Sequence, residues 1–352
     1  MKTPKDLGFR FPAEWHRHDG TWLSYPHNEN SWPGKIDSIF PSYNRFIAEL
    51  SKGERVNINI EDEASRERVE EELRNLKANL SNVSFHFFRT NDAWCRDHGP
   101  AFVIKANQKA IVDWDYNAWG GKYPCEQDNL IPGRIAEEAG FEVFRPHIVM
   151  EGGSIDVNGK GSLLTTTSCL LNKNRNPLLT QTEIEEKLCQ YYNVDNVIWL
   201  GDGIDGDDTD GHIDDMTRFV NEDTVVTVIE TDSQDENYDA LQQNLALLNK
   251  ARLHDGKQLN VVELPMPSPV IWDDMRLPAS YANFYIANGV VIVPTYRCDN
   301  DEKALCILES LFPDRRIVGI DSTDIIWGLG SFHCLSQQEP SLSEISKLKE
   351  TR

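Results

Sequence analysis

Short apolar runs, some alternating with polar residues, predict strands along most of the chain. Arg55–Ile60 alternates polar and apolar residues, which is typical of a half-buried strand. Other runs rich in β-branched and aromatic residues are bounded by turn-forming residues, as strands are in folded domains. These predicted strands are Val83–Phe88, Ala101–Lys105, Ala110–Trp114, Ser162–Thr167, Val197–Leu200, Thr224–Glu230, Val261–Leu264, Phe284–Ala287, Val290–Pro294 and Arg316–Ile320.

Helical segments lie between the predicted strands. The predicted helices are Glu61–Leu80, Gln181–Tyr192, Asp239–Ala251 and Glu302–Phe312. Thr180 and Glu183 have the spacing of a capping box at the start of the second of these. Because no predicted helix follows another directly, the pattern indicates an α/β or α+β fold. The residues after Pro340 predict a short charged helix or a frayed end.

The length and composition predict an ordinary folded protein. The chain has 352 residues, of which 39% are hydrophobic, enough for a sizeable core. Length alone allows one large domain or two modest ones. Since no Ser/Gly linker or low-complexity block divides the chain, we expect residues 1–352 to form one domain.

The charge balance limits the class of partner. The chain carries 35 basic and 57 acidic residues, a net charge of -22. Nucleic acid is excluded as a partner, because its binding depends on Lys and Arg neutralising phosphates. A small cation would be attracted by the same field. The alternative is that the acidity only keeps the protein soluble.

The cysteine pattern predicts neither a zinc site nor a disulfide framework. Seven cysteines occur at irregular spacing, without any Cys-x-x-Cys pair. They are Cys95, Cys125, Cys169, Cys189, Cys298, Cys306 and Cys334. A reducing cytoplasm fits this usage. The sequence shows no signal-peptide pattern and no apolar run long enough to span a bilayer, so a membrane partner is not expected.

Four short segments combine glycine, charge and a reactive side chain at the ends of predicted strands. They are Trp94–Pro100, Glu151–Ile155, Gly211–Asp215 and Gly328–Cys334. From Asp97 to Glu151 is 54 residues, from Glu151 to His212 is 61, and from His212 to Cys334 is 122, twice 61. Such spacing would arise if similar strand–helix modules each delivered one residue to a common centre. Five modules would hold about 70 residues each.

Each residue also has a structural explanation when taken alone. Cys334 could be a small buried hydrophobe, and Asp97 could pair with Arg96 or cap a turn. Glu151 could cap a loop. His212 stands beside an acidic pair that could raise its pKa and hold it protonated. Strand alternation would place Asp214 on the same face as His212, with Asp215 pointing away.

Together the segments resemble the agmatine deiminases and the related bacterial peptidylarginine deiminases, members of the guanidine-modifying superfamily. The resemblance covers most of the chain, from Pro12–Trp15 to His333–Pro340. The matching stretches between these ends are Thr21–Asn28, Trp32–Gly34, Trp94–Pro100, Tyr116–Gly121, Glu151–Ser154, His212–Asp214 and Ser280–Ile286. The resemblance implies a five-bladed α/β propeller (pentein) of ββαβ modules around a central active site, as one catalytic deiminase domain.

The resemblance also implies a role for each matching residue. Asp97 and Asp214 would bind the guanidinium through charge-assisted hydrogen bonds. Cys334 would attack the guanidinium carbon as thiolate. His212 would act as acid and base, and Glu151 would orient His212. The implied reaction is hydrolysis of agmatine to N-carbamoylputrescine and ammonia, in polyamine (putrescine) biosynthesis. No metal and no cofactor are expected, because carboxylates can localise a charge that the guanidinium already carries.

The chain departs from the family pattern just before the nucleophile. Agmatine deiminases usually carry three glycines and an Asn before the His-Cys pair, whereas this chain has Gly328–Ser331. We expect Leu329 and Ser331 to reshape the pocket wall. Trp94, Trp119 and Tyr281 are expected to line the channel by cation–π contact with an aliphatic cationic tail, the alternative being packing between blades.

Three other functions compete with this hypothesis. His16 and His18 form a His-x-His pair of the kind seen in some metal-dependent amidohydrolases, but the pair lies in a stretch expected to be a loop, and no later ligand set matches it. The acidic loop Asp202–Asp210 lacks the glycine and glutamate of an EF-hand. A non-catalytic binding protein would lack the nucleophile or the base. Within the family, the substrate could be a peptidyl arginine or free arginine. A homo-oligomer is compatible with the sequence.

Overall fold

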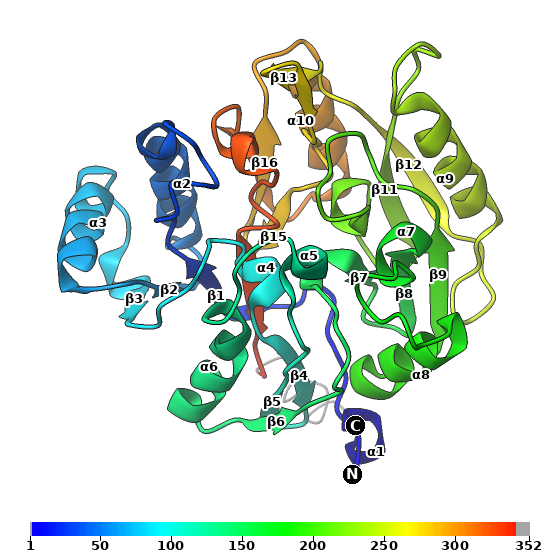
Figure 1. The fold of residues 1–352 in the computed structure, drawn as a ribbon, viewed down its shortest axis with the longest axis horizontal. Coiled ribbons are helices and arrows are strands. Elements are labelled where there is room, and N and C mark those ends of the chain that lie inside the picture. Colours follow the sequence, from blue (N-terminus) through cyan, green and yellow to red (C-terminus); the bar gives the residue numbers. More distant parts are fainter. Residues whose placement is uncertain (1, 343–352) are drawn as a thin grey trace.

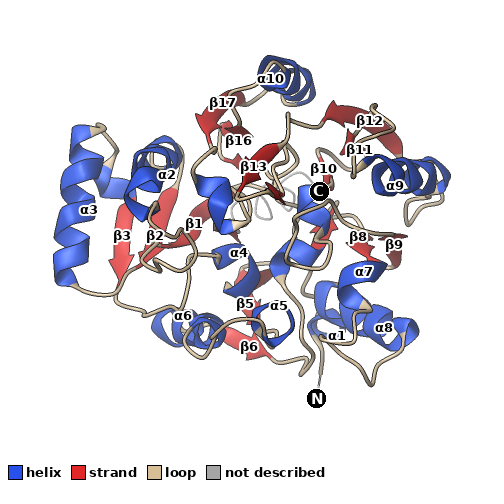
Figure 2. Cartoon of the chain, turned by 45° about the horizontal axis from the view of Figure 1, so that its top comes forward, coloured by secondary structure: helices blue, strands red, loops and turns tan. Residues whose placement is uncertain are grey.

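The computed structural model describes residues 2–342, and within them the strands form five sheets and one separate hairpin. Four sheets contain three strands and one contains four. The sheets stand around a common centre with helices on the outside (Figures 1 and 2). This is the arrangement expected of a five-bladed α/β propeller, so the predicted fold class is confirmed.

Each three-stranded sheet has the same order of connections. Its first strand pairs antiparallel with the second, and a helical crossover leads to a third strand parallel to the second. The three-stranded sheets are β4 (Ala101–Lys105), β5 (Gln108–Val112) and β6 (Glu142–Phe144); β7 (Ile155–Val157), β8 (Ser162–Thr166) and β9 (Asn196–Leu200); β10 (Thr217–Phe219), β11 (Thr224–Ile229) and β12 (Asn260–Pro265); β15 (Tyr285–Ala287), β16 (Val290–Thr295) and β17 (Arg316–Asp321).

The remaining sheet closes the ring, because it joins the two ends of the described chain. Its order is β18 (Ser336–Pro340), β1 (His18–Ser24), β2 (Arg55–Asn59) and β3 (Val83–His86). Strand β18 pairs antiparallel with β1, and β1 pairs parallel with β2. The ring is therefore complete only when the last strand has docked beside the first.

Helices connect the strands and cover the outer faces. The crossover helices are α2 (Ile36–Leu50), α3 (Glu63–Asn75), α6 (Ile131–Ala139), α8 (Gln181–Tyr192), α9 (Tyr238–Lys250) and α10 (Asn300–Leu311). The short helices are α1 (Pro4–Leu7), α4 (Cys95–His98), α5 (Ala118–Gly121) and α7 (Thr167–Leu170), with 3-10 turns η1 (Leu80–Asn82), η2 (Asp128–Leu130), η3 (Gly152–Ser154), η4 (Ile213–Asp215) and η5 (Ile325–Gly328). The separate hairpin is β13 (Val270–Trp272) with β14 (Met275–Leu277).

Local sequence signals explain several boundaries. The capping box of Thr180 and Glu183 is present at the start of α8, as predicted. Helix α3 is shorter than predicted at both ends: Asp62 caps its start by accepting a hydrogen bond from the Ser65 backbone N–H, and the helix ends at Asn75, shortly before Lys77 adopts a left-handed conformation with φ of 57°. Strand β2 was expected to be half-buried, yet Asn57 and Asn59 are buried as well. Since β2 lies between β1 and β3, both of its edges are paired, and the buried Asn59 donates to the Ser24 hydroxyl at 3.1 Å.

Two other expectations are wrong. Helix α7 leads to α8 without an intervening strand, so helices do follow one another directly. The stretch around His16 and His18 was expected to be a loop, but β1 begins at His18.

The tail predicted after Pro340 lies largely outside the described residues. No described helix is both long and apolar enough to cross a membrane.

The apolar core is divided among the interfaces between sheets. One cluster joins the sheets that contain β11 and β16, and another joins the first sheet to the sheet of β16. A third lies between the sheets that contain β5 and β8. Packing between neighbouring blades, rather than one central core, therefore holds the ring together, and the centre is left for polar residues.

We expect Phe46→Ala to lower the free energy of unfolding by about 3–5 kcal/mol. Phe46 lies on α2, is fully buried, and packs on Phe332 and Tyr285 with ring centroids 5.0 and 6.1 Å away. Urea denaturation would measure the loss. Leu178→Ala is the control, since Leu178 is 93% exposed and its removal should change stability by less than about 0.5 kcal/mol. Equal effects in the two variants would contradict this account of the packing.

Candidate active site

The candidate residues all lie just before the first strand of a sheet. Asp97 precedes β4, Glu151 precedes β7, and His212 precedes β10. Asn283 precedes β15, and Cys334 precedes β18. The repeated architecture therefore explains the spacing seen in the sequence, and Asn283 comes from the module that the double interval between His212 and Cys334 skips.

Asn283 was missed as a site residue, although its motif was recognised. Its side-chain N–H donates to the Cys334 Sγ at 3.0 Å, and to Asp215 at 2.8 Å. Its carbonyl oxygen accepts from the backbone N–H groups of His333 and Cys334 at 3.1 and 3.3 Å. Asn283 thus fixes both the backbone and the sulfur of the candidate nucleophile. The double interval was the signal that could have found it.

A cavity of about 320 Å³ contains Cys334 and Asp97 among its lining residues. Trp94 and Trp119 also line it, as predicted. The other lining residues are Asn28, Asn30, Ser31, Pro33, Asp92, Tyr123, Asp208, Thr209, Trp272, Met275, Trp327, Gly328, Leu329 and Gly330. The sulfur of the candidate nucleophile can therefore be reached by a small molecule.

Two predictions about the cavity wall are wrong. Tyr281 does not line the cavity; its side chain is buried and its hydroxyl donates to Asp301 at 2.6 Å, because it packs inside the sheet of β15. Ser331 is buried against Ser322, with the two hydroxyl oxygens 2.6 Å apart, and does not reach the wall either. Leu329 does line the cavity, and adopts a left-handed backbone conformation with φ of 70°.

Asp97 is held by two hydrogen bonds at the inner end of the cavity. One carboxylate oxygen accepts from the Gly153 backbone N–H, and the other from the Trp119 indole N–H, both at 2.9 Å. Burial raises the pKa of Asp97, and the neighbouring His212 opposes this rise. Gly153 permits the close approach, because an added Cβ would lie 2.7 Å from His212 Nδ1 and 2.8 Å from the Asp97 oxygen.

His212 is fully buried among three carboxylates. Its Nδ1 lies 3.8 Å from Asp97 and 4.0 Å from Asp214, and its Nε2 lies 3.9 Å from Glu151. Burial alone would lower the pKa of His212, but the negative charge of Asp97 and the neighbouring Cys169 and Glu151 side chains raise it well above its ordinary value. Neither ring nitrogen has a hydrogen-bond partner among residues 2–342. The surroundings therefore favour the charged imidazolium, whose N–H groups are available to donate a proton.

The acidic loop before His212 has a structural role. One oxygen of Asp207 accepts from the backbone N–H groups of Gly211 and His212, both at 3.0 Å. Asp210 accepts from Arg175 at 2.6 Å, and Arg175 donates through Nε to Glu151 at 2.6 Å. The loop therefore positions His212 directly and, through Arg175, also positions Glu151.

Glu151 has one oxygen on Arg175 and the other facing His212. Burial alone would raise the pKa of Glu151, but His212 and Arg175 beside it lower the pKa below its ordinary value. Glu151 thus carries a fixed negative charge next to His212, which agrees with an orienting role. Arg175 was missed from the sequence, because nothing in its Asn-rich neighbourhood signals a partner 24 residues away.

The surroundings of Cys334 favour its thiol form over the thiolate. Burial and the nearby carboxylates of Asp214, Asp215 and Asp97 raise its pKa well above the ordinary value. Its Sγ lies 3.6 Å from an oxygen of Asp214. A negative sulfur beside these carboxylates would be unfavourable until a positive charge enters between them.

Asp215 does not point away from the site, contrary to the prediction from strand alternation. Residues Ile213–Asp215 form the 3-10 turn η4, in which successive side chains do not alternate between two faces. Asp214 and Asp215 are both buried. Burial and the neighbouring Asp214 raise the pKa of Asp215 well above its ordinary value. The site therefore contains one more carboxyl group than predicted.

The histidine pair proposed for a metal site has other partners. His18 Nδ1 lies 3.1 Å from Glu54 and its Nε2 lies 2.7 Å from the Glu14 carbonyl oxygen, while His16 Nε2 lies 2.9 Å from the Ser341 carbonyl oxygen. Within residues 2–342, two other sets of side chains have metal-ligand spacing. These sets are Glu151, Cys169 and His212, and Asp214, Asp215 and Cys334. Both share side chains with the site described above.

Known proteins resemble this chain over nearly its full length. The sequence model of the Porphyromonas-type peptidyl-arginine deiminase family matches residues 10–340. The agmatine deiminase of Ectopseudomonas mendocina (strain ymp) is 33% identical over 367 residues, which cover 96% of this chain and 97% of the relative.

Solved structures extend the likeness to the fold. An agmatine deiminase of Enterococcus faecalis superposes with a TM-score of 0.90 at 34% identity, covering 97% of this chain and 98% of that chain. A Cys-to-Ser variant of the C. jejuni agmatine deiminase, with substrate bound, has a TM-score of 0.86 at 34% identity, covering 95% and 96%. The chain therefore belongs to the Porphyromonas-type peptidyl-arginine deiminase family, as its sequence motifs predicted.

Proposed function

We propose that this protein hydrolyses agmatine to N-carbamoylputrescine and ammonia through a covalent intermediate on Cys334. The observation that carries the proposal is the cavity that ends on Cys334 and Asp97, with His212 buried directly behind them. A thiol, a charged imidazole and several carboxylates are the groups that hydrolysis of a guanidinium needs. The relatives named above as agmatine deiminases support the same reaction.

Binding of the guanidinium prepares the nucleophile. Asp97 and Asp214 accept hydrogen bonds from its N–H groups, and its positive charge balances the carboxylates around Cys334. The same charge lowers the pKa of the Cys334 thiol, which releases its proton to solvent. The thiolate therefore forms only when a cationic substrate is in place, and an empty site is protected from side reactions.

The reaction then proceeds in two halves. The Cys334 sulfur forms a bond to the guanidinium carbon, and His212 donates a proton to the departing nitrogen, which leaves as ammonia. The product of this half is an S-alkylthiouronium. His212 next accepts a proton from water as the water oxygen bonds to the same carbon. The C–S bond breaks, leaving a ureido product and the Cys334 thiolate. Glu151 keeps the imidazole oriented through both halves.

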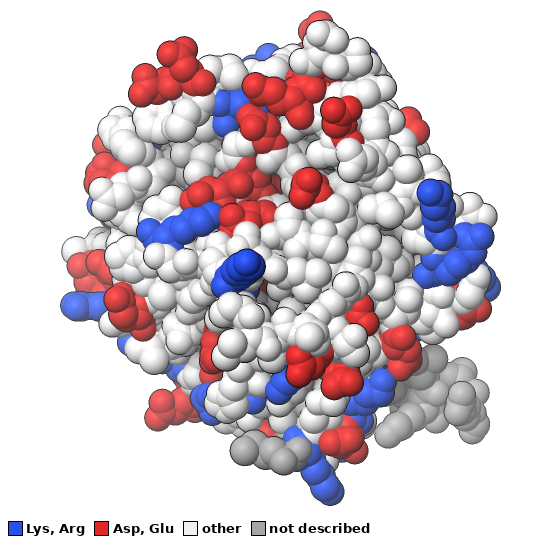
Figure 3. All heavy atoms as spheres, turned by 45° about the vertical axis from the view of Figure 1, so that its right-hand side comes forward, with Lys and Arg blue, Asp and Glu red and all other residues white. Residues whose placement is uncertain are grey.

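The cavity wall favours a substrate whose far end is cationic or neutral. No Lys or Arg is found among its described lining residues, whereas Asp92 and Asp208 are. The α-carboxylate of free arginine would find no basic partner there. Five aromatic side chains also line the cavity, and their faces attract an alkylammonium. Acidic side chains gather on the surface shown in Figure 3, in keeping with attraction of a cation.

The proposal extends to the pathway, the cell compartment and the domain organisation. We place the reaction in putrescine and polyamine biosynthesis in the cytoplasm, carried out by one catalytic domain over residues 1–352, with a homo-oligomer compatible with it. Neither nucleic acid, membrane, metal nor another cofactor is expected to take part.

We expect Cys334→Ala to abolish turnover of agmatine while leaving the protein folded. The assay measures ammonia and the ureido product from agmatine, free arginine and a peptidyl-arginine ester, with EDTA present. Cys306→Ala is the control, because Cys306 is exposed on the outer helix α10. Turnover of another guanidine would replace the substrate and keep the mechanism. Loss of activity with EDTA, restored by a metal, would instead support a metal-dependent hydrolase.

We expect iodoacetamide to label Cys334 of the empty enzyme slowly at neutral pH. Because burial and the carboxylates raise the pKa of this thiol, the labelling rate should rise only at a pH above the ordinary thiol value of about 8.5. Mass spectrometry of the Cys334 peptide against pH would measure this, with the Cys306 peptide as an internal control for the reagent. A midpoint at or below the ordinary value would contradict the substrate-dependent formation of the thiolate.

A further inference from the structure

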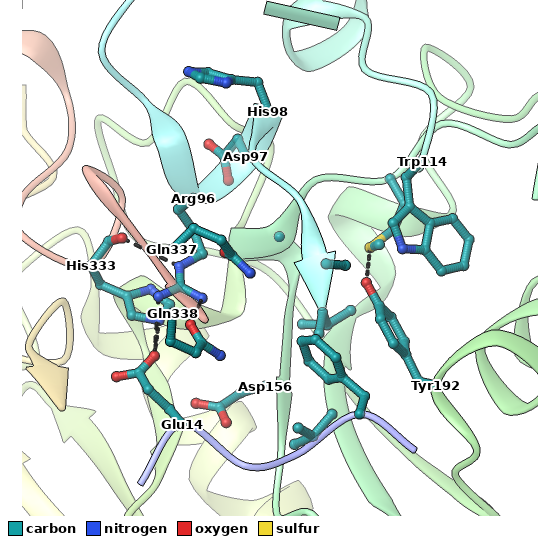
Figure 4. A pocket seen from close by; sticks show the side chains of 17 residues that line it. Glu14, Arg96, Asp97, His98, Trp114, Asp156, Tyr192, His333, Gln337 and Gln338 are labelled. Atoms are coloured by element: carbon teal, nitrogen blue, oxygen red, sulfur yellow. Dashed lines mark hydrogen bonds and ion pairs between the residues drawn. The ribbon is translucent and has the colours of Figure 1, made fainter. Parts of the chain in front are cut away.

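A buried histidine beside the nucleophile has no part in the mechanism above. His333 lies immediately before Cys334, and its ring stands between two carboxylates. Its Nδ1 lies 2.6 Å from an oxygen of Asp214, and its Nε2 lies 2.7 Å from an oxygen of Glu14. Figure 4 shows the Glu14 side of this arrangement, next to a small cavity of about 30 Å³. The three side chains form one continuous line that ends at the substrate site.

Glu14 is a rigid anchor for this line. It lies in the segment before β1, and one oxygen accepts from the backbone N–H of Ile286 in β15 at 2.8 Å. The same oxygen pairs with Arg218 in β10 at 3.0 Å, and the other pairs with Arg96 in α4 at 3.2 Å. Because elements of three further sheets hold this carboxylate, it cannot turn without breaking several bonds, and the ring of His333 is fixed with it.

The two carboxylate oxygens of Asp214 have different surroundings. The oxygen that faces His333 also lies 3.4 Å from the Asn283 amide nitrogen and 3.6 Å from the Cys334 sulfur. The other oxygen is buried, has no hydrogen-bond partner within the described part of the chain, and lies 4.0 Å from His212 Nδ1. An unpaired buried carboxylate oxygen is costly unless a ligand completes it. This oxygen is therefore the one available to a guanidinium N–H.

We propose that Glu14 and His333 are a positioning pair that holds Asp214 with one oxygen committed to the protein and the other free for the substrate cation. The pair deepens the proposed function and rests on it, since it acts on a guanidinium-binding carboxylate. His333 touches no substrate atom and acts only through Asp214.

Loss of the positioning pair should change the pKa of Asp214, because charged groups surround this carboxylate. Burial alone would raise the pKa of Asp214, but the hydrogen bond and charge of His333, together with His212 and Arg218, lower it. Asp97, Asp215 and the Cys334 sulfur also face Asp214. Without the charge of His333, these neighbours would favour protonation of Asp214. A carboxylate whose pKa has been lowered loses its charge at a higher pH when the lowering group is removed.

The test compares His333→Leu, His333→Asn and Glu14→Gln over a range from about pH 5 to pH 9. The leucine removes both ring nitrogens, whereas the asparagine amide retains a donor near the Nδ1 position. We expect His333→Leu to lower kcat/KM for agmatine about 10- to 100-fold, the usual cost of losing an orienting partner. We also expect the acid limb of the pH profile to move to higher pH. His333→Asn should recover most of the loss, and Glu14→Gln should shift the limb in the same direction.

His86→Asn is the matched control. His86 lies on the edge strand β3 and pairs with Glu138 at 2.7 Å, the same distance as between His333 and Glu14. Its loss removes a histidine–carboxylate pair without touching the cavity. We expect its pH profile to match that of the unaltered protein. If His333→Leu does not fold, as judged by thermal unfolding, Glu14→Gln carries the test, because it keeps the size of the side chain and removes its charge.

The possible results distinguish failure of the positioning pair from failure of the proposed substrate. The proposal is overturned if folded His333→Leu or Glu14→Gln keeps the original acid limb, or if His333→Asn loses as much activity as His333→Leu. If the unaltered protein does not turn over agmatine, the function fails, and the pair is then read by alkylation of Cys334 with a haloacetamidine. That reagent carries an amidinium head for Asp97 and Asp214, so the acid limb of its reaction must show the same shift.

Discussion

Four carboxyl groups are buried close together at the centre of this protein, and the arrangement of the neighbouring side chains follows from the need to give each a partner or a proton. Asp97, Glu151, Asp214 and Asp215 are buried around His212, His333 and Cys334. Isolated buried carboxylates are strongly unfavourable, so each is either paired or protonated. Arg175 pairs with Glu151. Burial beside Asp214 favours the protonated form of Asp215. A substrate cation would bind between Asp97 and Asp214, where its positive charge meets both carboxylates.

The same constraint accounts for the low reactivity expected of the nucleophile at rest. A thiolate in this centre would add a negative charge beside Asp214 and Asp97, so burial and these carboxylates favour the thiol form of Cys334. Substrate binding and activation of the nucleophile are then one electrostatic event. A neutral analogue of the same shape would occupy the cavity without producing that change. Specificity for a charged guanidinium thus follows from the buried charges rather than from the shape of the cavity alone.

Much of this could be predicted from the sequence, because local patterns and motif spacing carry the information. The strand and helix runs after Arg55 lie close to where the structure has them, and the even spacing of four motifs reflects the repeated sheets. The errors have physical reasons. Tyr281 shares a motif with Asn283, but the order of residues does not reveal which one faces the centre. Asp215 was misplaced because a 3-10 turn, not a strand, follows His212. Arg175 and Glu14 act from distant segments, and single-sequence patterns do not report such pairings.

The closed ring links folding to chemistry. No sheet contains more than a fraction of the site, since each delivers its residues from the segment before its first strand. Cys334 and His333 are delivered by the strand that closes the ring, so the nucleophile joins the other groups only when β18 pairs with β1. Glu14 enters from the opposite end of the chain and meets His333 at this closure. The contact between the two ends of the chain therefore completes the fold and, through His333, also sets the orientation of Asp214. The stability of the pairing between β18 and β1 and the geometry at the reacting carbon depend on the same few side chains.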